Sequence, residues 1–307
     1  MISVIFLLED QQEDFPDFLI NLDRIFSRLG TSYELVVVAN GTGNFFRTIQ
    51  SRLNNLNHTL RAFEFGAQVT QATALKAILN EAQGDILAIF GSYQQITDES
   101  LAQCIQSMDD TADVVSPFRQ QRVDPSFNQF QSRVFNALVK ALIRTDIHDF
   151  SCTVKICRRS VLEGIDLYGN MFRFFPVLAA AKGFRINEVK VEHLQERGKA
   201  GFYSLSEYIT RILDIFTLFF NTRFSRKPLR FFSTVGVGFI MLGLVLLTII
   251  VIQRLYFSIL IGDRPLLFVS LLFMFLGVIV SSAGLLGEII AFTNGRHKKE
   301  YMIEKVI

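Results

Sequence analysis

The sequence predicts an α/β protein with a mostly parallel sheet, followed by a helix at the membrane interface and two membrane-spanning helices. Three observations lead to this prediction. Short β-type runs alternate with helical patterns in the first two thirds of the chain. Half of the 307 residues are apolar, although the charged fraction of 20% is ordinary for a soluble protein. The apolar excess lies after residue 230, which indicates a globular region followed by a membrane region.

The globular region begins with a strand. The first residues, Met1 to Leu8, are apolar but lack basic residues and run directly into acidic ones, so they are not a signal peptide. The predicted strands are Ser3–Leu8, Glu34–Ala39, Asp85–Phe90 and one starting within Ala112–Val115. The predicted helices are Phe15–Leu29 and Thr70–Ala82. Parallel sheets bind ligands at the carboxyl ends of their strands, so the residues after each strand are the first candidates for a site.

Charge and cysteine content exclude several classes of protein. A net charge of +2, with no basic run interleaved with aromatic residues, argues against nucleic-acid binding. The three cysteines, Cys104, Cys152 and Cys157, are odd in number and lack a CxxC pair. They are therefore expected to be buried thiols in a reducing compartment and not disulfide partners or zinc ligands.

Two apolar segments near the C-terminus are long enough to span a bilayer. They are Phe231–Ile252, which is uncharged, and Leu266–Phe292, which is interrupted only by Glu288. Basic residues precede the first segment and follow the second, so both termini are expected on the cytoplasmic side of the inner membrane. Glu288 either has a partner or extends toward the cytosolic end of its helix.

The segment before the membrane region has an amphipathic helical pattern. Apolar residues recur at helical spacing between Ser204 and Phe224, and basic residues follow. This pattern fits a helix at the membrane interface and equally a core helix of the globular region. The expected organisation is a globular domain at residues 1–203, a juxtamembrane helix at 204–230, two spanning helices at 231–292 and a cytosolic tail at 293–307.

Several motifs occur in the order and spacing of one enzyme family. They are Ala74-Leu75 with Ala82–Asp85, Asp149–Lys155 with Arg158-Arg159, the stretch from Arg173 through His193 and Arg197 to Tyr203, Gly262–Leu267, and Gly284–Glu288. Together they resemble the family-2 glycosyltransferases of GT-A fold that act on polyprenyl phosphates, such as dolichyl-phosphate mannose synthases. The resemblance spans nearly the whole chain. It implies a Rossmann-like domain, a nucleotide-sugar donor, a polyprenyl-phosphate acceptor and Mg²⁺ or Mn²⁺.

The chain departs from this family where the donor is bound. The family has an acidic Y-N-E-E segment after its first strand, against Glu9-Asp10-Gln11-Gln12 here. The carboxylates of D-D-G-S-x-D are absent from Ala39–Asn44. The metal motif D-x-D-L-Q…E becomes Gly91-Ser92-Tyr93-Gln94-Gln95 with Glu99 retained, so the resemblance leaves the metal ligands unknown.

The resemblance also implies roles for individual residues. Asp149 stands where the family's proposed catalytic base lies, although an N-cap or a salt bridge is the alternative. Donor contacts are expected from Asp10, Asn40, Gln95 and Glu99. Contacts to the acceptor phosphate are expected from Arg119, Arg122, Arg133, Lys155, Arg173 and Arg197, each of which could instead be a solvated surface charge. His193, after the β-like Val189–Val191, either orients the acceptor phosphate or is a structural residue.

The chemistry leaves two main functions open. Sugar transfer expels a nucleoside diphosphate, whose charge a divalent cation held by carboxylates usually stabilises. An active transferase would need arginines for this, or a metal held by Glu99 and Asp10. The alternative is a catalytically inactive relative that acts as a partner or regulator of an active glycosyltransferase in cell-surface glycan assembly. A homo-oligomer is compatible with either function, and a scaffold that uses only its membrane helices is a weaker third reading.

Overall fold

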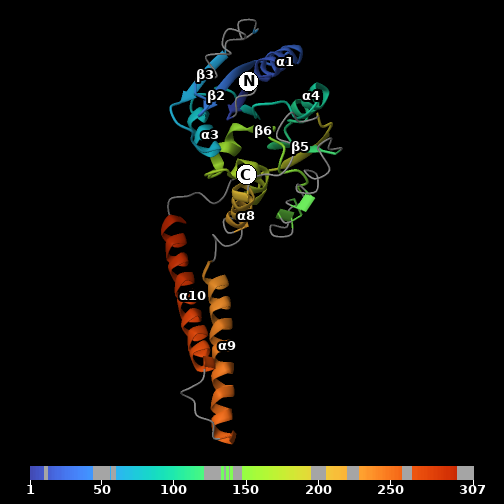
Figure 1. The fold of residues 1–307 in the computed structure, drawn as a ribbon. Coiled ribbons are helices and arrows are strands. Elements are labelled where there is room, and N and C mark those ends of the chain that lie inside the picture. Colours follow the sequence, from blue (N-terminus) through green and yellow to red (C-terminus); the bar gives the residue numbers. More distant parts are fainter. Residues whose placement is uncertain are drawn as a thin grey trace, which may run out of the picture. The chain divides into compact units, whose positions relative to one another are not determined.

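The structure, a computed structural model, describes residues 1–9, 13–43, 56, 60–120, 133–134, 136–137, 139–140, 147–194, 205–219, 228–257 and 265–295. These residues divide into two compact units, Met1–Leu218 and Phe219–Ile307. The first unit contains the sheet and the second contains two long helices (Figure 1).

The first unit is built on a seven-stranded sheet with the order β3-β2-β1-β4-β6-β5-β7. The strands are β1 (Ile2–Leu8), β2 (Tyr33–Asn40), β3 (Leu60–Phe65), β4 (Ile86–Phe90), β5 (Val114–Arg119), β6 (Lys155–Arg158) and β7 (Ile186–Val191). All run parallel except β6, which pairs antiparallel with β4 and β5. The predicted mostly parallel sheet is therefore confirmed, and each of the four predicted strands is present within a few residues.

Helices cover both faces of the sheet. In the first unit they are α1 (Phe15–Arg28), α3 (Gln71–Leu79), α4 (Asp98–Gln106), α6 (Arg159–Gly164), the 3₁₀ helix η2 (Met171–Phe174), α7 (Phe175–Ala181) and α8 (Leu205–Phe219). Thr70 and Thr97 cap α3 and α4, because each hydroxyl accepts a hydrogen bond from the backbone N–H three residues on. The caps place the first turns of α3 and α4 directly after the loops that follow β3 and β4.

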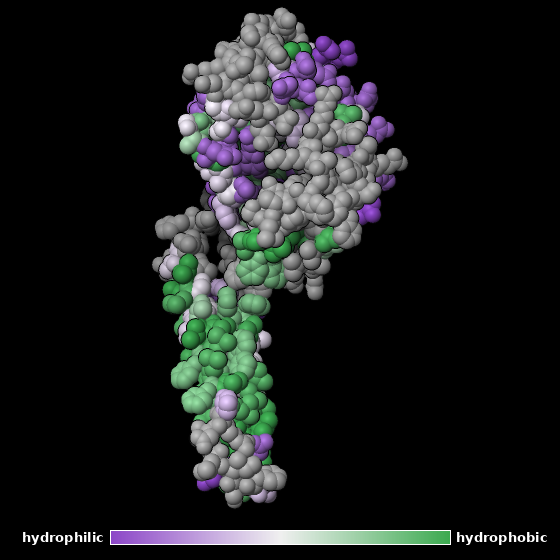
Figure 2. All heavy atoms as spheres, viewed as in Figure 1, coloured by the Kyte–Doolittle hydropathy of each residue, from purple (hydrophilic) through white to green (hydrophobic). Residues whose placement is uncertain are grey.

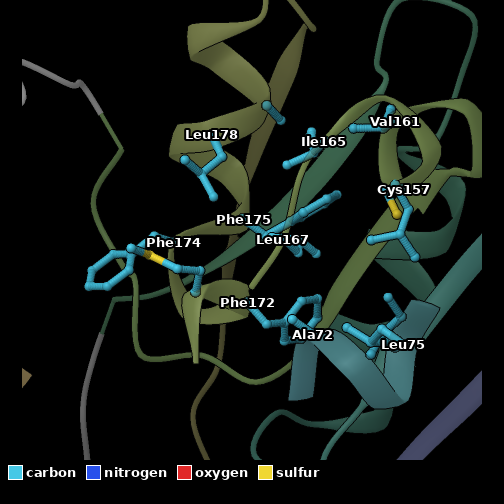
Figure 3. Packing of buried hydrophobic residues seen from close by; sticks show 14 of the residues in the cluster. Ala72, Leu75, Cys157, Val161, Ile165, Leu167, Phe172, Phe174, Phe175 and Leu178 are labelled. Carbon is cyan, nitrogen blue, oxygen red and sulfur yellow. The ribbon is translucent and has the colours of Figure 1, made fainter. Parts of the chain in front are cut away.

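Alternate residues of the strands supply two hydrophobic cores, one on each face. Ile5 and Leu7 of β1 face the core formed with α3, α6 and α7, whereas Phe6 packs edge-to-face on Phe15 and Phe18 of α1. Figure 3 shows part of the first core, in which side chains of α3, α6, η2 and α7 gather, with Cys157 of β6 beside Val161 of α6. All seven residues of β1 are buried, as expected for a central strand covered on both sides.

Helix α8 is apolar on two sides. Ile215 and Leu218 are buried in the first unit's core, so this helix packs on the globular unit. Another side remains uncovered: Ile209, Ile212, Leu213 and Phe216 are between 51% and 63% exposed. The alternative of a core helix is thus supported for one side of α8, whereas contact of the exposed side with the membrane interface stays a prediction.

The second unit contains α9 (Pro228–Phe257) and α10 (Pro265–Gly295), both long and apolar enough to cross a membrane. This confirms the two predicted apolar helices, whose surfaces form the green region of Figure 2. Glycines bring the helices close together: a Cβ added at Gly277 would lie 2.5 Å from the carbonyl oxygen of Gly236. Glu288 has a partner, since its Oε2 accepts a hydrogen bond from the backbone N–H of Leu229 at 3.2 Å. The carboxylate thus satisfies an N–H in the first turn of α9.

Candidate functional site

The candidate site lies at the carboxyl edge of the sheet. Because β1, β2, β4, β5 and β7 run parallel, the residues after them meet at one edge. Strand β6 runs the other way, so the residues that precede it, Asp149–Val154, reach the same edge. The topology thus brings together residues that are far apart in the sequence.

A buried ion pair lies at this edge. Arg119, the last residue of β5, donates from Nε to Oδ2 of Asp149 at 2.7 Å and from Nη2 to Oδ1 at 3.2 Å. The side chains are 0% and 4% exposed. Such a two-pronged contact holds both groups in fixed orientation and away from water.

Further donors surround the Asp149 carboxylate. Ser151 donates to Oδ1 from both its backbone N–H and its hydroxyl, each at 2.9 Å. The Ser151 hydroxyl in turn accepts from Nη2 of Arg119 at 2.9 Å. Four hydrogen bonds thus reach the two oxygens of Asp149 and fix the orientation of its carboxylate.

His193 completes this group after β7. Its Nε2 lies 3.3 Å from Nη1 of Arg119. A guanidinium can only donate, so Nε2 is the acceptor in this hydrogen bond. The hydrogen-bonded structural role is thereby supported, because the histidine binds Arg119 directly.

Lys155, the first residue of β6, is completely buried. Its Nζ has no hydrogen-bond partner among the residues that the structure describes. Burial lowers the pKa of this ammonium, and the nearby Cys152 and Asp149 oppose the shift. A phosphate contact from Lys155 remains a prediction, and it would require the side chain to become accessible.

The loops after β1 and β2 form a second hydrogen-bonded group. Asn40 is 1% exposed; its Nδ2 donates to the carbonyl oxygen of Val69 and its Oδ1 accepts from the Val69 N–H, both at 2.8 Å. Glu9 Oε2 accepts from Gln71 at 2.7 Å, and Oε1 accepts from Asn40 at 3.4 Å. The amide of Asn40 donates to one backbone group of Val69 and accepts from the other, whereas an aspartate carboxylate at position 40 could only accept.

The loop after β4 is bound to the loop before β6. Gln95, which is 2% exposed, accepts at Oε1 from the N–H and the hydroxyl of Thr153, at 2.8 and 3.0 Å. Its Nε2 donates to the Tyr93 hydroxyl at 3.1 Å. Ser92 donates to the carbonyl oxygen of Leu7 at 3.3 Å and accepts from the N–H of Glu9 at 3.2 Å. These contacts join the ends of β1, β4 and β6 directly.

The residues present do not fit a divalent cation at this position. No group of three or more His, Cys, Asp or Glu side chains within the described ranges could hold a metal ion. Mg²⁺ and Mn²⁺ prefer carboxylate oxygens. Instead, the positions that correspond to the family's metal motif carry glycine, serine and tyrosine.

The remaining predicted residues are dispersed. Glu99 is exposed in the first turn of α4, and Arg133 is exposed. Arg173 lies in η2. Burial raises the pKa of Asp214 on α8, and the nearby charge of Arg173 opposes this rise. Asp10, Arg122 and Arg197 lie outside the described residues. The structure therefore gathers Arg119, Asp149 and Gln95 at the edge, whereas Arg173 lies near α8.

Sequence reasoning missed several residues that organise the site. Ser151 and Thr153 lie within the Asp149–Lys155 motif, but their hydrogen bonds to Asp149 and Gln95 were not foreseen. The available signal in the sequence was that Asp149, Ser151 and Thr153 are polar residues at alternate positions just before the short strand β6. Gln71, at the start of α3, had no such signal, because its contact with Glu9 spans 62 residues.

Comparison with known proteins agrees with this fold. The model of "Glycosyl transferase family 2" matches residues 16–166. The structure resembles glucosyl-3-phosphoglycerate synthase from Mycobacterium tuberculosis, solved with Mn²⁺, UDP and phosphoglyceric acid, with a TM-score of 0.53 and 13% identity over 72% of this chain and 78% of that one. At this identity the likeness shows the fold alone.

Relatives are also similar over the whole length. Undecaprenyl-phosphate 4-deoxy-4-formamido-L-arabinose transferases from Proteus mirabilis and Yersinia enterocolitica are each 26% identical to the chain. The similarity covers 100% of this chain and 94% and 93% of these relatives. Together with the GT-A-type sheet and the motif order, these matches show that the chain is similar to family-2 glycosyltransferases.

Proposed function

We propose that the protein is a membrane-bound glycosyltransferase that transfers a sugar from a nucleotide-sugar donor to a polyprenyl phosphate at the cytosolic leaflet of the inner membrane. The observation that carries the proposal is the buried group of Arg119, Asp149 and His193 at the ligand-binding edge of the sheet. The relatives' names contain undecaprenyl phosphate, a polyprenyl phosphate, and this supports the acceptor class.

The chemistry of the acceptor suits this group. A phosphate monoester is already an anionic nucleophile near neutral pH, so deprotonation by a base contributes little and positioning contributes most. Asp149 has each oxygen engaged by hydrogen-bond donors. We infer that its carboxylate orients Arg119 and the Ser151 hydroxyl at the edge where substrates meet, and thereby shapes the acceptor side of the site.

The membrane segments suit a lipid acceptor. The two long apolar helices would anchor the chain, with both termini in the cytoplasm as the flanking basic residues predict. The exposed apolar side of α8 would lie on the bilayer surface. A phosphate at the level of the lipid headgroups would then be held close to the globular unit.

A transfer assay tests the proposal. The full-length protein in lipid nanodiscs would be mixed with undecaprenyl phosphate and a panel of radiolabelled UDP-, GDP- and dTDP-sugars, and the lipid-linked product would be extracted. We expect labelled lipid with one donor. Asp149→Ala should abolish the product. Asp98→Asn should retain it, because Asp98 accepts hydrogen bonds from Asn21 and Gln94 and does not belong to the buried group of Arg119, Asp149 and His193.

A second function is favoured by a specific observation. Gly91, Tyr93 and Asn40 stand where the resembled family has carboxylates, which fits a catalytically inactive relative that partners or regulates an active glycosyltransferase. Absence of labelled lipid with all donors, together with co-purification of an active transferase from the native membrane, would support this function and contradict the first.

A further inference from the structure

A hydrogen-bonded connection within the protein lies where the resembled family holds a metal. It consists of Tyr93, Gln95 and Thr153, and we call it the 93–95–153 bridge. Two hydrogen bonds of 2.8 and 3.0 Å, from Thr153 to Gln95, join the loop before β6 to the loop after β4. A third, of 3.1 Å, joins Gln95 to Tyr93 within the loop after β4. Gln95 is 2% exposed, so the bridge is shielded from water at its centre.

The packing around Gly91 leaves little room for an acidic side chain. A Cβ added at this position would lie 3.3 Å from both Cβ and Oγ1 of Thr153. The contact is with the first atoms of a β-branched residue whose hydroxyl is bound to Gln95, so it cannot easily move aside. An aspartate at position 91 would therefore disturb the bridge.

The side-chain oxygen atoms of Ser92 and Gln95 in this loop are engaged in hydrogen bonds within the protein. Gln95 Oε1 accepts two hydrogen bonds from Thr153, which occupies both of its lone-pair positions. The Ser92 hydroxyl binds the backbone of Leu7 and Glu9. A hard cation would have to displace these contacts and would gain neutral ligands in place of carboxylates.

We propose that the 93–95–153 bridge takes the structural place of the divalent cation, so that this chain binds its nucleotide donor without Mg²⁺ or Mn²⁺. By direct hydrogen bonds, the bridge holds the loop after the end of β4 against the loop before the start of β6. The donor diphosphate is then neutralised by donors of the chain itself. The inference rests on the proposed function for the identity of the donor. The Mn²⁺ titration described below does not depend on that function.

The full-length protein in detergent micelles would be titrated with Mn²⁺, and free Mn²⁺ followed by electron paramagnetic resonance, with and without UDP. Binding of UDP, GDP and dTDP would be measured by calorimetry in Mn²⁺ and in EDTA. We expect no stoichiometric Mn²⁺ on the protein and a nucleotide Kd that changes by less than about twofold between the two conditions.

Stoichiometric Mn²⁺ binding, or a nucleotide affinity about tenfold higher with Mn²⁺, would overturn the inference. If none of the nucleotides binds in either condition, the proposed transfer is contradicted, while the Mn²⁺ titration still decides the question of the cation.

A variant provides a positive control. The triple change Gly91→Asp, Tyr93→Asp and Thr153→Gly removes the side chain against Gly91 and supplies two carboxylates, so it should gain Mn²⁺ binding. Tyr93→Phe is the matched variant, because it removes one hydrogen bond and adds no ligand, and it should remain without Mn²⁺. A triple variant that fails to fold does not affect the measurement on the unchanged protein.

Discussion

Arg119 Nε donates to Asp149 Oδ2 at 2.7 Å, and neither side chain has more than 4% of its surface exposed. Thirty residues separate the two in the sequence, so the pair links the end of β5 to the loop before β6. Removing one partner of a buried ion pair leaves an uncompensated charge, which costs far more than loss of a surface pair. The pair is therefore a structural determinant of the site as well as a part of it.

Asp149→Asn should lower the free energy of unfolding by about 3–5 kcal/mol, because the Arg119 charge would remain buried without its partner. Thermal unfolding can be followed with a thiol-reactive dye, since Cys104, Cys152 and Cys157 are all buried in the folded chain. Burial also raises the pKa of the Cys104 thiol to about 12, so it reacts slowly until the protein unfolds.

The control for this change is Glu99→Gln, an exposed carboxylate in α4 that should alter stability by less than about 0.5 kcal/mol. An Asp149→Asn protein that unfolds at the unchanged temperature would show that the pair contributes nothing to stability. The double variant Asp149→Asn with Arg119→Gln should regain part of the loss, since the two effects are coupled.

Asp113, which links the starts of β5 and β7, should make stability depend on pH. Hydrogen bonds from the Arg185 side chain hold the pKa of this carboxyl below its ordinary value of 3.8, against a smaller opposing effect of burial. A lowered folded-state pKa contributes stability above 3.8 that is lost as the pH falls through the folded value.

Asp113→Asn should therefore lose less stability than the unchanged protein as the pH falls from neutral to below 3.8, as measured by circular dichroism during heating. Asp110→Asn is the matched variant, because Asp110 is fully exposed and bound to Arg158 only at 3.4 Å. Equal acid sensitivity of the Asp113→Asn protein and the unchanged protein would show that this carboxyl does not carry the effect.

Because α9 and α10 approach each other closely, the stability of the helix pair should depend strongly on the glycines between them. Gly277→Ala places a Cβ within 2.6 Å of Ile240 Cγ1 and should destabilise the helix pair by about 1–3 kcal/mol through overpacking. Gly238→Ala should be neutral, because no atom lies within 4 Å of its added Cβ. Gel filtration of heated detergent extracts measures the difference, and equal survival of both variants would contradict the described helix packing.

The sequence predicted the strands that are buried on both sides, because Ser3–Leu8 and Glu34–Ala39 are continuous runs of β-type apolar residues. It did not predict β3 and β6. Strand β3 is an edge strand with exposed alternating positions, and β6 has four residues, among them Lys155 and Arg158. Short or charged strands are formed by their neighbours in the sheet, which local patterns do not reveal.

The role that the resemblance implies for Asp149 stays a prediction, and the contacts of this residue could not be predicted from the sequence. Its pairing with Arg119 depends on the register of β5 against β6. Likewise Asn40 reads as the loss of a carboxylate in the sequence. The structure instead gives its amide a defined role, with two hydrogen bonds to Val69 that an aspartate could not both form.

The exposed side of α8 provides a last prediction, on contact with lipid. Ile212 is 63% exposed and Phe216 57%, whereas Leu218 on the opposite side of the helix is 0% exposed. Large apolar side chains at successive turns are stable in this exposed position if they enter the bilayer interface. Spin labels on Ile212→Cys and Phe216→Cys, in the full chain in nanodiscs, should therefore collide more with membrane-soluble oxygen than with a water-soluble nickel complex.

Labelling at these sites is selective because the native cysteines are buried. Lys76→Cys, on the exposed side of α3, is the matched position and should show the opposite preference, since a surrounding of water favours the nickel complex. If labels at Ile212 and Phe216 met the nickel complex as often as the label at Lys76 does, α8 would face water, and its apolar side would have to be covered by protein instead of lipid.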